Sequence, residues 1–143
     1  MNPLKHAQGL SATIARIILG VIFVMHGWQK LFTNGIDQTR MGFESMDVPA
    51  PEIAAWFAGI AEFVGGILLI IGIAVPLVAL ILIIDMIGAI IFAHMDAGFW
   101  VNEGGYEFVL ALIAGLIAIA VAHQGALSVD AHVAKRFSRS RNR

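Results

Sequence analysis

The chain has 143 residues, of which 59% are apolar and 13% are charged, and its mean hydropathy is +0.84. An ordinary soluble domain has about 45–50% apolar and about 25% charged residues, so this composition predicts an integral membrane protein and excludes disorder. The net charge of −1 argues against nucleic acid as a partner, and the lack of cysteine excludes disulfides and Fe–S clusters.

Four apolar segments follow one another along the chain, at about 11–32, 53–74, 76–95 and 105–123. Each approaches the roughly 20 residues with which a helix crosses a hydrocarbon core about 30 Å thick. None alternates with the period of two that is typical of barrel strands. We therefore expect an all-α fold, in which residues 1–130 form a bundle of four transmembrane helices and residues 131–143 form a basic cytoplasmic tail.

A tight turn is predicted between the second and third segments. Gly72 is typical of a helix C-terminus, and Pro76 is typical of a first helical turn. One long kinked helix is the less favoured alternative, because residues 53–95 are too many to cross a single bilayer.

Lysine and arginine are distributed unevenly around these segments. The tail carries five of them, whereas the connections after the first and third segments carry only Arg40. The positive-inside rule then places both termini in the cytoplasm, which requires an even number of spans across the plasma membrane.

The first segment has no small-x-small cleavage site, so we expect it to be retained. The tryptophans at 28, 56 and 100 are expected to anchor the outer interface, with lining for a quinone-like head group as the alternative.

Several ionisable residues interrupt the apolar segments, where an unpaired charge costs several kcal/mol. Helical rise places Glu62 about 14 Å below the start of its segment and Asp85 at a similar depth. In the second, third and fourth segments the acid shares a face with glycine or alanine, and in the first segment Lys30 shares one with Gly20 and Gly27. Membrane helices pack closely on such faces. We therefore expect a polar pocket in the outer half of the bundle, formed by His26, Lys30, Glu62, Asp85 and Glu107.

Two interpretations of this pocket have equal weight. In one, the residues bind a ligand or relay protons. In the other, they are structural pairs, Lys30 with Glu107 or His26 with Glu62, that fix the order of the helices. Asp85 is a candidate for a protonated carboxyl group, because no lysine or arginine is expected at its depth. The chain lacks the Glu-x-x-His and His-Glu-x-x-His motifs, so we expect no metal site, and the few deep histidines disfavour haem.

Several motifs of the chain resemble those of DoxX-type membrane proteins. Residues 16–30 have the pattern of the family's first helix, with an arginine, a Leu-Gly pair and then Gly-x-x-Lys. Residues 62–72 resemble its second helix, with a glutamate, paired glycines and Leu-x-x-Gly. Residues 102–107 and 125–130 resemble the entry and exit of its fourth helix, although residues 123–126 replace the more usual Gly-Pro-Gly exit.

This resemblance implies a four-helix inner-membrane protein whose signature polar residues are Arg16, Lys30, Glu62 and Glu107. The family takes its name from a subunit associated with thiosulfate:quinone oxidoreductase. The resemblance therefore implies a small subunit of a quinone-linked redox system, with quinone as the candidate cofactor and a redox protein as the candidate partner. Any enzymatic activity would belong to such a complex rather than to this chain alone. The alternative function is a membrane scaffold or assembly protein, and a proton-coupled transporter ranks third. The sequence does not determine whether the chain forms a homo-oligomer.

Overall fold

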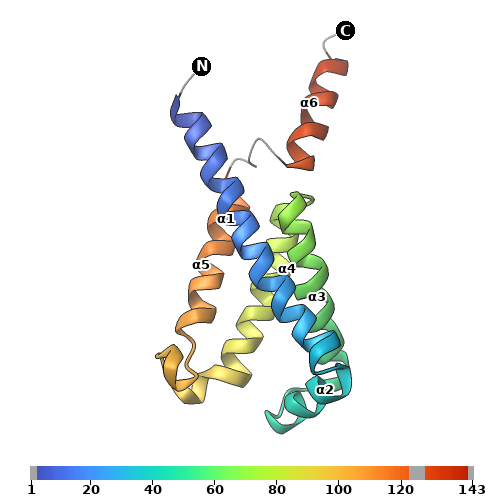
Figure 1. Cartoon of the computed structure of the whole chain (residues 1–143), viewed down its shortest axis with the longest axis vertical. Helices are drawn as coiled ribbons and strands as arrows, with labels where there is room; N and C mark the ends of the chain where they lie inside the picture. Colours follow the sequence, from blue (N-terminus) through green and yellow to red (C-terminus); the bar gives the residue numbers. More distant parts are fainter. Residues whose placement is uncertain (1–2, 123–127, 142–143) are drawn as a thin grey trace.

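The structure of the chain is a computed structural model that describes residues 3–122 and 128–141. These residues form helices and turns, and four of the helices pack into a bundle in which successive helices run in opposite directions (Figure 1). The four are α1 (Pro3–Trp28), α3 (Pro51–Ile71), α4 (Val75–Ala89) and α5 (Glu107–Val121). Two further helices lie at opposite ends of this bundle, α2 (Ile36–Ser45) at one end and α6 (Val129–Arg141) at the other. The start of α1 lies at the same end as α6 (Figure 1).

Apolar side chains cover the outside of the bundle as well as its interior. The core is built from all four helices, with Phe23, Leu69, Leu82 and Leu116 almost completely buried. Large aliphatic side chains such as Ile84, 55% exposed, point outward on every helix of the bundle. Contiguous exposed apolar surface of this extent is typical of a protein surrounded by lipid.

Three of the described helical segments are long and apolar enough to cross a membrane, namely His6–Thr33, Pro51–Ile71 and Val75–Ala97. They correspond to the first three predicted segments. The fourth apolar helix, α5, has 15 residues and is shorter than predicted, because short turns occupy the chain before Glu107. The predicted end of this segment, at His123, lies outside the described residues.

Helices α1 and α3 approach each other backbone to backbone through glycine. A Cβ atom added at Gly66 would lie 2.6 Å from the backbone nitrogen of Val24, and one added at Gly20 would lie 2.7 Å from the carbonyl oxygen of Gly66. A Cβ at Gly27 would collide with the backbone of Phe63. The prediction that these small-residue faces are packing faces is confirmed for α1 and α3.

The predicted turn between the second and third segments is also confirmed. Gly72 ends α3 with φ 76°, in the left-handed region that favours glycine, and its N–H donates a hydrogen bond of 2.8 Å to the carbonyl of Leu68. Helix α4 begins at Val75 with a proline in its first turn. The alternative of one long kinked helix is therefore wrong.

The turn after α3 also holds the start of α6 in place. The Asp130 N–H donates to the carbonyl of Gly72 at 3.2 Å, and the Val75 N–H donates to Asp130 Oδ2 at 3.4 Å. Arg16 lies buried beneath this turn, 3% exposed, and a Cβ atom at Gly72 would collide with its guanidinium group. Arg16 therefore belongs to a cluster at the end of the bundle where α1 begins.

Candidate functional site

A buried ion pair joins α1 to α3 in the half of the bundle near α2. Lys30 Nζ lies 2.7 Å from Glu62 Oε2, and the side chains of the two residues are 22% and 4% exposed. Glu62 projects from the glycine-rich face of α3, which brings it within reach of the end of α1. The structure therefore pairs Lys30 with Glu62, in place of the expected pairs Lys30 with Glu107 or His26 with Glu62.

Asp85 of α4 adds a second carboxyl group to this pair. It interacts electrostatically with both Glu62 and Lys30, and its carboxyl group is within hydrogen-bonding reach of Glu62. Its Oδ2 atom is buried and accepts no hydrogen bond from the part of the chain that the structure describes. Lys30 lines the same cavity as Asp85, but among the described residues its ion pair is with Glu62 and not with Asp85.

The backbone is irregular on both sides of this cluster. Helix α1 continues as a π-helical turn, η1 (Gln29–Thr33), which contains Lys30, and α4 continues as a second one, η2 (Ile90–His94). Turns of this kind are rare and frequently occur at functional sites. His94 Nδ1 lies 2.7 Å from the carbonyl oxygen of Gly104, so the second turn is tied to the loop before α5.

Helix α2 supports the position of Lys30. The hydroxyl group of Thr39, which is buried, donates a hydrogen bond of 2.8 Å to the carbonyl oxygen of Lys30. Thr39 does not stand out in the sequence, because it lies in a connection that is polar overall. A signal was present, since Gly35 at the N-cap and Asp37 in the first turn are typical of a helix start.

Two cavities border the ion pair. One, of about 180 Å³, lies among α1, α4 and α5, and His26, Lys30, Glu62 and His94 are part of its wall. The other, of about 280 Å³, lies among α2, α3 and α4, and its polar side chains are Lys30, Glu62, Asp85 and His94. Apolar side chains make up most of the remaining wall in both. The structure thus brings together four of the five residues predicted for the polar pocket and adds His94.

Glu107 is the predicted pocket residue that the structure places elsewhere. It is the first residue of α5, and its Oε2 atom accepts a hydrogen bond of 3.3 Å from the backbone N–H of Val101. It lines neither cavity. A carboxylate in the first turn of a helix is stabilised there by the helix dipole, which accounts for its position without a ligand.

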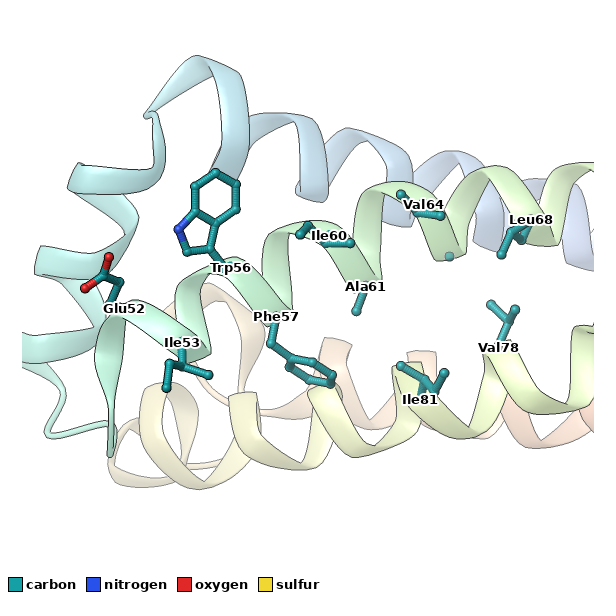
Figure 2. Close-up of a pocket in the computed structure, with 11 residues that line it drawn as sticks. Glu52, Ile53, Trp56, Phe57, Ile60, Ala61, Val64, Leu68, Val78 and Ile81 are labelled. Carbon is teal, nitrogen blue, oxygen red and sulfur yellow. The ribbon is translucent and has the colours of Figure 1, made fainter.

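An apolar groove opens between α3 and α4 on the outside of the bundle (Figure 2). Its volume is about 640 Å³, and it runs from Glu52 and Trp56 at one end to Leu68 and Val78 at the other. Phe57 lines both this groove and the cavity that contains Asp85. Phe57 is therefore part of the wall of both the groove and the polar cavity.

An all-helical bundle with an apolar outer surface and paired charges in its interior defines an integral membrane protein. The comparisons with known proteins agree with this class and identify the family. The sequence model of the DoxX family matches residues 11–95, which is more than half of the chain. The chain therefore belongs to the DoxX family, as the first- and second-helix motifs predict.

Several relatives match the chain over most of its length. It is 32% identical to the uncharacterized membrane protein Rv3486 of Mycobacterium tuberculosis, over 93% of this chain and 88% of the relative. It is 30% identical to the putative oxidoreductase CatD of Bacillus subtilis, over 88% of this chain and 89% of the relative. It is 26% identical to the inner membrane protein YphA of Escherichia coli, over 91% of this chain and 99% of the relative. No solved structure gives a significant match.

Proposed function

We propose that this chain is a multi-pass subunit of a quinone-linked redox system in the plasma membrane, and that it binds the quinone head group at Lys30, Glu62 and Asp85. One observation carries the proposal: a lysine and two carboxyl groups converge at a cavity that borders a groove open to lipid. The name of the Bacillus subtilis relative, a putative oxidoreductase, supports a redox role.

The polar cluster has the chemistry that a quinone head group requires. Reduction of a quinone to a quinol takes two electrons and two protons at its two ring oxygens. The ammonium group of Lys30 is suited to donate a hydrogen bond to one such oxygen. Carboxyl groups are common proton donors and acceptors in catalysis, so Asp85 and Glu62, which line the same cavity, are suited to exchange protons with the bound head group. The electrons come from a partner redox protein.

The apolar groove suits the tail of the same molecule. Membrane quinones carry a long apolar chain, and the groove between α3 and α4 presents apolar side chains such as Ile60 and Val64 to it (Figure 2). Because Phe57 is part of the wall of both the groove and the polar cavity, we propose that a movement of its ring connects them. This arrangement would admit a head group from the side of the bundle, with no need to leave the membrane.

The proposed topology has four spans and both termini in the cytoplasm. Two observations support this topology. The start of α1 and helix α6 lie at the same end of the bundle, and the sequence of α6 and of the residues after it is basic. Helix α5 measures about 22 Å at 1.5 Å per residue, which is short of a hydrocarbon core of about 30 Å. Flanking residues or local thinning of the bilayer would make up the difference.

Equilibrium binding of a short-chain benzoquinone to the purified protein in lipid nanodiscs tests the head-group site. We expect saturable binding to the unaltered chain, and a Kd at least about tenfold higher for Asp85→Asn and Lys30→Met, as expected when one hydrogen bond to a charged group is lost. Glu44→Gln, which alters an exposed acid, is the matched control and should bind normally.

Two results would contradict the proposal. One is an unchanged Kd in a folded Asp85→Asn variant. The other is the absence of saturable binding to the unaltered chain together with impaired folding of both variants. That second result would favour the scaffold interpretation, in which the buried charges are structural.

A further inference from the structure

We propose that α6 is an interfacial helix that binds the anionic lipid surface of the membrane at the end of the bundle where α1 begins. The apolar part of the helix forms one stripe. Val129, Val133 and Phe137 are spaced four residues apart, and they are 43%, 46% and 73% exposed. This spacing places the three side chains on one side of the helix. The rest of the described chain leaves all three largely exposed on that side.

The remainder of α6 is strongly basic. Lys135 and Arg136 are exposed on it, and the sequence adds Arg139, Arg141 and Arg143. Against these five cations stands a single acid, Asp130, whose carboxylate accepts a hydrogen bond from the start of α4. An apolar stripe beside clustered cations is the pattern of helices that lie in the head-group region of a membrane.

The fold fixes the start of α6 at the end of the bundle. Ser128, directly before the helix, is 1% exposed, and Asp130 is hydrogen-bonded to the turn between α3 and α4 through Gly72 and Val75. The apolar surface of α3 and α4 ends at that turn. Helix α6 therefore starts at the boundary of the apolar surface and extends away from the bundle, roughly along its long axis (Figure 1). To bind the lipid surface, the helix has to tilt about its anchored start so that the apolar stripe reaches the head groups.

The charge of α6 indicates which partner binds to its exposed side. An anionic lipid surface offers negative head groups to the cations and an apolar layer to the stripe at the same time, and it adjoins the helix wherever the bundle is inserted. The attraction weakens with salt, because the cations are exposed and are screened by ions. The proposal is independent of quinone binding.

The natural lack of cysteine makes the test direct, because a single introduced cysteine gives one labelling site in the full chain. Val133→Cys places an environment-sensitive fluorophore on the apolar stripe. Ser138→Cys places it away from the stripe, at an exposed position, and is the matched control. Both labelled variants are compared in nanodiscs of phosphatidylcholine alone and in nanodiscs of phosphatidylcholine with phosphatidylglycerol. In each disc the two membrane surfaces have the same lipid composition.

We expect the emission at position 133 to shift to the blue when phosphatidylglycerol is present. High salt, or the double change Lys135→Gln/Arg136→Gln, should reverse the shift, and position 138 should change little. Identical spectra at 133 in both lipids would overturn the proposal. A blue shift that is the same in neutral discs and persists in the charge variant would also overturn it, because it would show that the stripe is covered by a second copy of the chain or by uncharged lipid.

Discussion

The buried pair Lys30–Glu62 should stabilise the protein through a coupling between the two residues. Removing one partner of a buried ion pair costs about 3–5 kcal/mol when the other charge is left uncompensated. Glu62→Gln should cost less, about 1–3 kcal/mol, because Lys30 is 22% exposed and Asp85 lines the same cavity. Lys30→Met should reach the upper range, about 3–5 kcal/mol, because it leaves two carboxyl groups together without their lysine.

A double-mutant cycle measures this coupling. Unfolding of both single variants and of the double variant Lys30→Met/Glu62→Gln is followed in the same lipid and detergent. We expect the double variant to lose about 1–3 kcal/mol less than the sum of the single losses. The exposed pair of Arg40 and Glu44 at 3.0 Å is the matched control, with a coupling of about 0.3–0.5 kcal/mol. Single losses that add without coupling would refute the inference that the pair stabilises the bundle.

Three further predictions concern packing, the turn and topology. Gly66→Ala should lower the free energy of unfolding by about 1–3 kcal/mol, because the added Cβ atom would collide with the backbone of α1. Gly88→Ala is the control and should be neutral or slightly stabilising, because its Cβ atom would meet nothing within 4 Å. Equal effects of the two substitutions would contradict the close contact between α1 and α3. Gly72→Ala should lower the thermal unfolding temperature, because it combines a positive φ with a collision with Arg16, and an unchanged temperature would show that the turn rearranges freely. A reporter fused to the carboxyl terminus should be cytoplasmic and one inserted at Asn34 external, and an external carboxyl terminus would overturn the four-span topology.

The features that depend on local periodicity could be predicted from the sequence. Apolar runs of about the right length identify the helices, and Gly72 identifies the turn after α3. Helical spacing also places Glu62 and Asp85 on faces that turn inward, because a buried acid on a small-residue face has no favourable position toward lipid.

The features that depend on distances between helices could not be predicted in this way. The side chain of Lys30 is long enough to meet more than one acid, so its partner depends on where α1 ends relative to α3. Lys30 itself lies in the π-helical turn after α1, and the sequence analysis found no signature that predicts this turn. Glu107 was predicted to lie in the pocket because it shares a face with small residues such as Ala111 and Gly115. Helix α5 instead begins at Glu107, whose carboxylate accepts a hydrogen bond from the preceding loop.

Photoaffinity labelling tests the quinone site most directly. A quinone with a photoreactive group on its ring is irradiated with the protein in its native membranes, and the labelled peptides are mapped by mass spectrometry. We predict labelling near Asp85 and Glu62, suppressed by an excess of unmodified quinone and reduced in Asp85→Asn. Labelling spread over the lipid-facing surface of all helices and insensitive to the competitor would contradict the proposed site.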